Sequence, residues 1–166
     1  ISFVGSTAVA KYIYSRAAQN GKRAQCQGGA KNPAVVLPDA DMEMTTRILS
    51  DSAFGCAGQR CLATSVAITV GDARKEFTER MVAAAEARKV GYGLEKDTQM
   101  GPVISAESKS RIAGLIDKGI GQGARLLTGG ANAEVDGFRD GYRLRVMPDL
   151  QGTDMRGSGN DNLPPA

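Results

Sequence analysis

The chain has 166 residues, of which 42% are hydrophobic and 23% are charged, and its formal net charge at pH 7 is +3. This composition is typical of one globular domain, and the interleaving of acidic with basic residues gives no support for a nucleic-acid partner. No apolar run approaches the roughly 18 to 20 residues that cross a bilayer, and no secretory signal opens the sequence, so we expect a cytoplasmic protein without a membrane partner.

Strand patterns alternate with helix patterns along the chain. We predict strands over residues 1–4, 23–27, 34–37 and 66–70, and helices over residues 8–18, 42–54, 72–89 and 105–120. Asp39 or Asp41 can cap the second helix, because a short carboxylate accepts hydrogen bonds from first-turn amides. Pro33 disfavours continuous strand pairing at its position. Alternating strands and helices indicate an α/β fold.

A glycine-bearing segment, Gly55–Cys61, separates the second predicted helix from the next strand. It is too irregular for a strand and too rich in glycine for a helix interior, which predicts a loop that presents its side chains. Cys61 is a candidate nucleophile, because Arg60 is adjacent and a helix starting after the loop would favour the thiolate. The alternative is a buried, inert thiol.

The spacing of Gly119, Gly121 and Ala124 formally matches a dinucleotide-binding glycine motif. A phosphate cradle needs a strand before the glycines and a helix after them. Here a predicted helix precedes and a predicted strand, residues 124–128, follows. We therefore interpret the glycines as a helix C-cap and turn.

The sequence contains no histidine and three cysteines: Cys26, Cys56 and Cys61. Without histidine, no nucleophile in this chain can be activated by a histidine of the same chain, and zinc loses its usual nitrogen ligands. We expect no metal site. An odd number of cysteines without a secretory context favours free thiols. We interpret Cys26 as a core residue, the alternative being a catalytic or redox role, and Cys56 as a small loop residue, the alternative being a disulfide or metal pair with Cys61.

Five segments, in order, resemble the aldehyde dehydrogenase superfamily. They are FVGST at 3–7, GGAKNP at 28–33, DAD at 39–41, FGCAGQRC at 54–61 and MGPVIS at 100–105. The resemblance covers residues 1–142 and implies a partial aldehyde dehydrogenase fold. Residues 1–27 would be the end of the NAD-binding domain and residues 28–150 part of the catalytic domain, followed by a disordered tail at 151–166.

The resemblance implies a covalent mechanism in which the Cys61 thiolate attacks an aldehyde, hydride leaves for NAD, and a thioester remains. The backbone amide of Cys61 would hold the developing oxyanion. Gly5 and Ser6 match the turn of the family that lies near the cofactor. The resemblance also implies a homo-oligomeric parent protein.

Two departures from the hydrolytic members narrow the resemblance. Cys26 stands where those members carry the glutamate that activates water, and Ala30 is inserted in the GGAKNP segment. Together with Arg60 beside the nucleophile, these features resemble methylmalonate-semialdehyde dehydrogenase, the branch that transfers the acyl group to coenzyme A. A thiol such as coenzyme A attacks a thioester without a strong base. Pro33 departs from this branch, which more often has histidine there.

Several alternatives stay open. Arg60 either holds the carboxylate of a semialdehyde substrate through two parallel bonds or simply packs in the loop. The chain is either part of an acylating enzyme, part of a hydrolytic dehydrogenase of another aldehyde, or an inactive remnant that serves as an interaction module. We expect the isolated chain neither to bind NAD tightly nor to oxidise an aldehyde.

Overall fold

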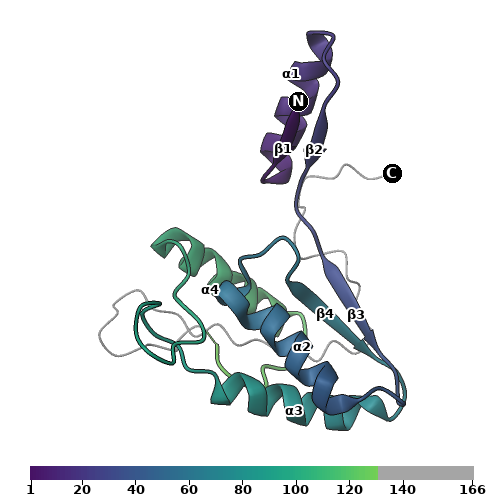
Figure 1. Cartoon of the computed structure of the whole chain (residues 1–166), viewed down its shortest axis with the longest axis vertical. Coiled ribbons are helices and arrows are strands. Elements are labelled where there is room, and N and C mark those ends of the chain that lie inside the picture. The colour runs from purple at the N-terminus through teal and green to yellow at the C-terminus, as the bar shows by residue number, and fades with distance from the viewer. Residues whose placement is uncertain (131–166) are drawn as a thin grey trace. The chain divides into compact units, whose positions relative to one another are not determined.

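The computed structural model describes residues 1–130, which fall into two compact units (Figure 1). The first unit is Ile1–Lys31, and the second begins at Asn32. The expected tail at 151–166 lies outside the described residues, as does the last part of the expected catalytic domain. None of the described helices is both long and apolar enough to cross a membrane.

The first unit is a strand, a helix and a second strand. β1 (Ser2–Val4) pairs in parallel with β2 (Gln25–Gln27), and α1 (Thr7–Gln19) connects them. Ala10 and Ala17 are the buried residues of α1, and such small side chains let a helix approach neighbouring strands closely. The predicted elements at 1–4, 8–18 and 23–27 are therefore confirmed.

The second unit combines a parallel strand pair with helices. Its elements are β3 (Asn32–Val36), α2 (Met42–Phe54), the short turn η1 (Gly55–Gly58), β4 (Thr64–Thr69), α3 (Ala73–Ala87) and α4 (Ala106–Gly121). β3 pairs with β4 in parallel, and the register shifts between Asn32 and Pro33. Proline cannot donate to a strand ladder, which accounts for the irregularity at this position. These elements confirm the α/β expectation.

The second helix begins where its sequence predicts. Asp41 is the N-cap of α2, and its side chain accepts a hydrogen bond of 3.0 Å from the amide of Met44. Of the two aspartates that the sequence offers, Asp41 is therefore the cap. The helix ends at Phe54, which is buried. The chain then enters the glycine-bearing segment Gly55–Cys61, which we call the cysteine segment.

The core of the second unit lies where α2 and α3 meet β3 and the segment after α3. Its largest fully buried side chains are Phe77, Met100 and Val36. Phe77 and Met81 come from the predicted apolar face of α3, and Phe54 is contributed by the last turn of α2. Burying a side chain of this size stabilises a fold by roughly 1.5 to 3 kcal/mol. This core fixes the end of α2, and thereby the start of the cysteine segment.

α4 is less buried than its apolar pattern suggests. Ile116 is 8% exposed, but Leu115 and Ile120, on the same predicted stripe, are 44% and 45% exposed. At its end, Gly123 (φ 95°) donates to the Ile120 carbonyl and Ala124 to the Gly119 carbonyl, at 3.0 and 2.9 Å. This pair of bonds is a helix C-cap, as expected. The predicted strand at 124–128 is wrong, because these residues form no strand.

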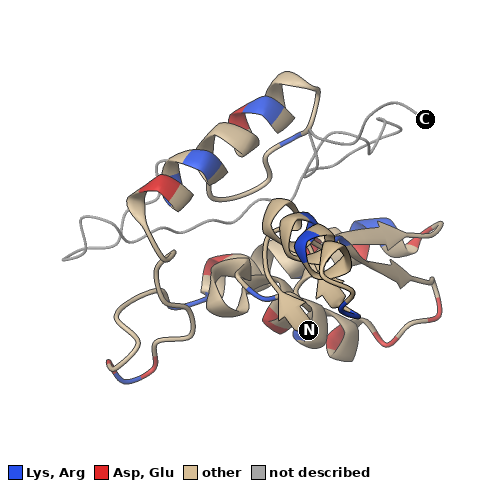
Figure 2. Cartoon of the chain, turned by 90° about the horizontal axis from the view of Figure 1, so that it is seen from above, with Lys and Arg blue, Asp and Glu red and all other residues tan. Residues whose placement is uncertain are grey.

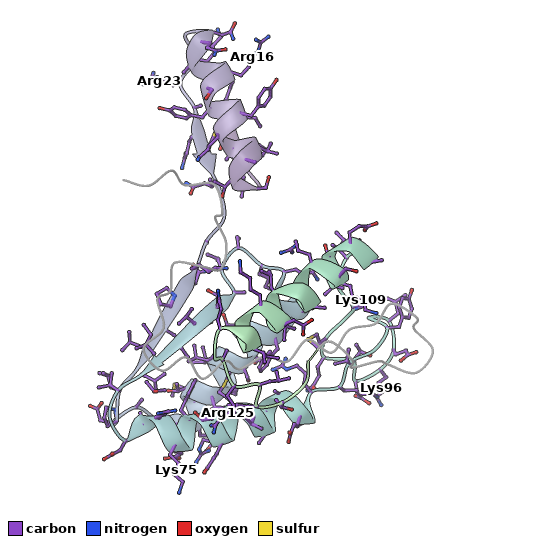
Figure 3. The ribbon with its side chains drawn as sticks, turned by 180° about the vertical axis from the view of Figure 1, so that it is seen from behind. Arg16, Arg23, Lys75, Lys96, Lys109 and Arg125 are labelled. Carbon is purple, nitrogen blue, oxygen red and sulfur yellow. The ribbon has the colours of Figure 1, made fainter. Side chains whose placement is uncertain are left out.

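Charged side chains are spread over both units (Figure 2). The labelled basic residues Arg16, Lys75, Lys96 and Lys109 come from separate segments: α1, α3, the connection after α3, and α4 (Figure 3). Lysines and arginines therefore do not form a continuous stripe along any one described helix, in keeping with the interleaved charges of the sequence.

Candidate active site

Cys61 lies in a tight turn between η1 and β4, and its side chain is exposed. The Ala63 amide donates a 3.1 Å hydrogen bond to the Arg60 carbonyl, which closes a four-residue turn with Cys61 at its second position. The Cys61 amide has no hydrogen-bond acceptor among the described residues. The predicted loop is confirmed, with Cys61 exposed and its amide not bonded to any described residue.

The helix that we expected after the cysteine segment is absent. Cys61 is followed by the rest of the turn and then by β4, and the preceding helix, α2, directs its C-terminal end toward the segment. The first-turn amides of a helix therefore do not stabilise a thiolate at Cys61. The hydrophobic, β-branched residues after the turn favour a strand over a helix here.

The backbone before Cys61 is in a left-handed conformation over three consecutive residues. Cys56 has φ 52° and ψ 32°, Ala57 has φ 54° and ψ 34°, and Gly58 has φ 74°. For residues other than glycine this conformation costs roughly 1 to 2 kcal/mol each. Such strain persists only where the surrounding structure enforces it, and it concentrates at functional sites.

Asn32 holds the cysteine turn from the start of β3. Its Nδ2 atom donates to the Cys61 carbonyl at 2.8 Å and to the Ala63 carbonyl at 3.0 Å. Its backbone amide donates to Oγ of Ser65 at 2.9 Å. The GGAKNP and FGCAGQRC motifs therefore meet at the turn, through a residue that the sequence did not single out.

Gln59 connects the cysteine segment to the MGPVIS segment. Its Nε2 atom donates to the Cys56 carbonyl at 2.9 Å, and its Oε1 atom accepts from the Ile104 amide at 3.0 Å. Met100 and Val103 anchor the MGPVIS segment in the core, at 2% and 6% exposed. The Gln59 side chain thus connects the left-handed backbone at Cys56 to the MGPVIS segment, which is anchored in the core.

The MGPVIS segment leads directly into α4. Ser105 is the N-cap of this helix and accepts a 3.2 Å hydrogen bond from the Ser108 amide. A backbone hydrogen bond, with a smaller contribution from Ser105, lowers the pKa of the exposed carboxyl group of Glu107. A charged carboxylate in the first turn of a helix stabilises that helix, so the segment is fixed at its far end as well.

Ser52 and Arg88 fix the two ends of the cysteine segment. Oγ of Ser52, on α2, accepts from the Thr64 amide at 3.0 Å and lies 3.0 Å from the Thr64 hydroxyl, at the start of β4. The Arg88 guanidinium pairs with Asp51 at 2.7 Å and lies 5.7 Å from the centre of the Phe54 ring. These contacts hold the last turn of α2 against β4 and the end of α3.

Arg60 contacts Cys56 and not Cys61. Its Nε atom donates to Sγ of Cys56 at 3.2 Å. A Cβ atom at Gly55 would lie 2.9 Å from Nη1 of Arg60, so the glycine makes room for the guanidinium. The guanidinium that the sequence places next to Cys61 therefore contacts the sulfur of Cys56 in the structure. No carboxylate in the described part of the chain pairs with Arg60.

Gly5, Ser6 and Cys26 lie in the first unit. Gly5 and Ser6 form the turn before α1; Ser6 is the N-cap residue, but its side chain makes no capping hydrogen bond. A Cβ atom at Gly5 would lie 2.6 Å from the Phe3 ring, so any larger residue here would force the ring to move. Cys26 is half-buried in β2, opposite Phe3.

All three cysteines are free thiols, as expected. Within residues 1–130, no group of three histidine, cysteine, aspartate or glutamate side chains could hold a metal ion. The turn around Cys61 itself offers an exposed thiol beside an amide that has no acceptor among the described residues.

Comparisons with known proteins place these features in one family. The family model described as "Aldehyde dehydrogenase family" matches residues 1–147. The mitochondrial methylmalonate-semialdehyde dehydrogenase [acylating] of Arabidopsis thaliana is 47% identical over 157 residues, which are 91% of this chain and 26% of that protein.

Solved structures agree with the family model. A methylmalonate-semialdehyde dehydrogenase from Oceanimonas doudoroffii matches with a TM-score of 0.80 and 42% identity, over 85% of this chain and 29% of its own. A betaine aldehyde dehydrogenase from Staphylococcus aureus, in complex with NAD+, matches with a TM-score of 0.80 and 31% identity, over 85% of this chain and 28% of its own.

These matches correct the expected cytoplasmic location. The Arabidopsis relative is named as mitochondrial, and the chain spans about a quarter of that protein's length. The expectation had relied on a missing signal at the first residue of the sequence. A chain that matches only part of a longer relative carries no information about a leader at that point.

Proposed function

Because the chain belongs to the aldehyde dehydrogenase family, we propose that it carries the nucleophile of an NAD-dependent, coenzyme A-acylating dehydrogenase of malonate or methylmalonate semialdehyde. The chain spans about a quarter of the length of the relative named above, so the activity is that of a protein containing the remaining family elements. Cys61 is the proposed catalytic residue.

The observation that carries this proposal is the geometry of the turn. The Cys61 thiol is exposed, its amide has no acceptor among the described residues, and the carbonyls of Cys61 and Ala63 are both held by Asn32. A nucleophile needs an accessible sulfur, and an oxyanion needs a nearby donor that is not already bonded. The turn meets both requirements.

The reaction begins when the Cys61 thiolate attacks the aldehyde carbon. A carbon–sulfur bond forms, and the carbonyl electron pair moves to the oxygen, where the Cys61 amide can donate a hydrogen bond. When bound, NAD supplies the hydride acceptor of the oxidation. The acyl group that remains is a thioester of Cys61. The thiolate of coenzyme A then attacks the thioester carbon, and Cys61 leaves as a thiolate.

Cys26 supports transfer to coenzyme A over hydrolysis. It stands where hydrolytic members of the family carry a glutamate, and its thiol is a poor base for water. Coenzyme A needs no such base, because its thiol is ionised to a useful extent near neutral pH. The word "acylating" in the name of the Arabidopsis relative agrees with this proposal.

The first unit contains features that could bind part of NAD. The turn residues Gly5 and Ser6 precede α1, a helix of 13 residues, and the Ser6 hydroxyl is not used for capping. The amides at a helix N-terminus bind anionic groups, and a free hydroxyl beside them adds a donor. We propose that these two residues contact the cofactor.

Arg60 is the proposed contact for the substrate carboxylate. It follows the strained backbone, and no carboxylate of the described residues occupies it. A guanidinium binds a carboxylate through two parallel hydrogen bonds. In the structure its Nε atom contacts Cys56, so the Nη atoms are the ones proposed to meet the substrate.

Acyl transfer from an activated ester tests the proposal without a need for NAD. A p-nitrophenyl ester acylates a reactive thiol directly, and peptide mass analysis locates the acyl group. We expect Cys61 to be acylated first and the acyl group to leave faster with coenzyme A than with water. The Cys61→Ser variant is the control for the site of acylation.

Two results would contradict the proposal. Acylation of Cys56 or Cys26 ahead of Cys61 would show that Cys61 is not the nucleophile. Discharge by water that coenzyme A does not accelerate would favour the hydrolytic alternative. The Cys26→Glu variant should not improve an acylating enzyme. A gain in turnover in this variant would favour the hydrolytic alternative, because a glutamate can activate water.

A further inference from the structure

We propose that Asn32 is a positioning residue for the nucleophile, an inference that rests on the proposed role of Cys61. Its single side-chain nitrogen donates to the carbonyls on both sides of Leu62, at 2.8 Å for Cys61 and 3.0 Å for Ala63. Leu62 itself is 81% exposed. The clamp therefore shapes the backbone that carries the thiol, without contacting the thiol.

The main chain fixes Asn32 independently of its side chain. Its amide donates to Oγ of Ser65, and its Cα is paired with that of Thr64 at the end of the β3–β4 ladder. Pro33 follows, and the residue before a proline favours an extended backbone. A substitution at position 32 therefore removes the clamp while the strand that presents it can remain.

A carboxamide is the side chain that suits this task. One nitrogen with two N–H groups meets two carbonyl oxygens, whereas a serine hydroxyl offers one proton and an aspartate carboxylate offers none. Each N–H neutralises the negative end of a carbonyl dipole. Because the Cys61 carbonyl belongs to the residue that carries the thiol, a donor at position 32 acts directly on the backbone of the nucleophile.

The electrostatic role and a purely structural role predict different orders of effect. Asn32→Asp keeps the shape of the side chain but places a carboxylate against two carbonyl oxygens. Asn32→Ala removes the side chain and leaves the carbonyls to water. If Asn32 acts through its donors, the aspartate variant is the worse one. If it acts through its volume, the alanine variant is the worse one.

The test compares two cysteines within one molecule. Iodoacetamide is added to the native 166-residue chain, and the alkylation rates of Cys61 and Cys56 are read from the same sample by peptide mass analysis. Cys56 contacts Gln59 and Arg60, so it serves as an internal reference. We expect the ratio of the Cys61 rate to the Cys56 rate to fall about 3-fold in Asn32→Ala and about 10-fold in Asn32→Asp. Added salt should make the decrease in Asn32→Asp smaller, because it screens the new carboxylate.

Asn20→Asp is the matched control. The Asn20 side chain also donates from Nδ2 to a carbonyl, that of Arg16 at 2.7 Å, but it lies at the end of α1 in the first unit. This variant should leave the ratio unchanged. Hydrogen exchange at the Ala63 amide, which closes the turn, should accelerate in both Asn32 variants. The Thr64 amide, held by Ser52, should stay protected.

The outcomes separate this inference from the proposed function. A reactive Cys61 whose rate is unchanged in Asn32→Asp, or is lowered more by alanine than by aspartate, would overturn the inference alone. If Cys61 of the unmodified chain is no more reactive than Cys56, the proposed function fails and this inference fails with it.

Discussion

Removing the Gln59 side chain should release the cysteine segment from the MGPVIS segment. In the structure this side chain donates to the Cys56 carbonyl at 2.9 Å and accepts from the Ile104 amide at 3.0 Å. The Gln59→Ala variant loses both bonds at once. The strained residues Cys56 and Ala57 then lose one of the contacts that enforce their left-handed backbone.

The magnitude follows from the two bonds. A neutral hydrogen bond contributes roughly 0.5 to 1.5 kcal/mol to stability, and both of these are exposed, so the lower half of that range applies. We expect the variant to lose about 1 to 2 kcal/mol of local stability. That loss corresponds to an increase of roughly 5- to 30-fold in the population of the opened segment.

Hydrogen exchange at the Ile104 amide measures this opening directly. In Gln59→Ala the exchange should accelerate by the factor given above. Gln59→Glu is the control, because a carboxylate still accepts from the Ile104 amide but cannot donate to the Cys56 carbonyl. It should keep the Ile104 amide protected. Equal protection of Ile104 in Gln59→Ala and in the unmodified chain would refute the reasoning.

Three further predictions concern strain, substrate charge and the core. Cys56→Gly should raise the free energy of unfolding by about 0.5 to 1 kcal/mol in a denaturant titration, because glycine adopts φ 52° without strain; a loss of stability would argue against a strained turn. Arg60→Lys should lower the rate at which iodoacetate, relative to neutral iodoacetamide, alkylates Cys61; an unchanged ratio would assign Arg60 to packing. Phe77→Ala should cost about 3 to 5 kcal/mol by the same titration, because Phe77 is only 2% exposed, and a cost below about 1 kcal/mol would contradict this core.

The sequence predicted the elements of the fold because their signals are local. The Asp41 cap and the apolar spacing set the bounds of α2 at Met42 and Phe54. The end of α4 at Gly119 to Ala124 was predictable because glycines commonly end helices and a predicted helix precedes these glycines. By contrast, the strand predicted at residues 124–128 did not form. A strand needs a partner to pair with, and the local sequence pattern does not show whether one is present.

The sequence singled out Cys61 as the candidate nucleophile but not the residues that hold its turn. Asn32 lies 29 residues from Cys61, and Gln59 lies 45 residues from Ile104. Contacts at such separations depend on the tertiary fold, so no local pattern reports them. Both residues do lie inside the motifs GGAKNP and FGCAGQRC, which was the one available signal.

The left-handed backbone of the cysteine segment was equally hidden from the sequence. Cys56 and Ala57 have no intrinsic preference for positive φ, unlike glycine or asparagine. In the structure Gln59 contacts the Cys56 carbonyl and Arg60 contacts the Cys56 sulfur. The same geometry explains why Arg60 reaches Cys56, although sequence adjacency suggested Cys61.

The central claim, that Cys61 is the nucleophile, is tested most directly by a competition among the three thiols under native conditions. Each cysteine's alkylation rate in the folded chain is divided by its rate in the unfolded chain, which removes intrinsic differences between the peptides. The account predicts the highest ratio for Cys61. A ratio for Cys61 that does not exceed those of Cys26 and Cys56 would contradict it.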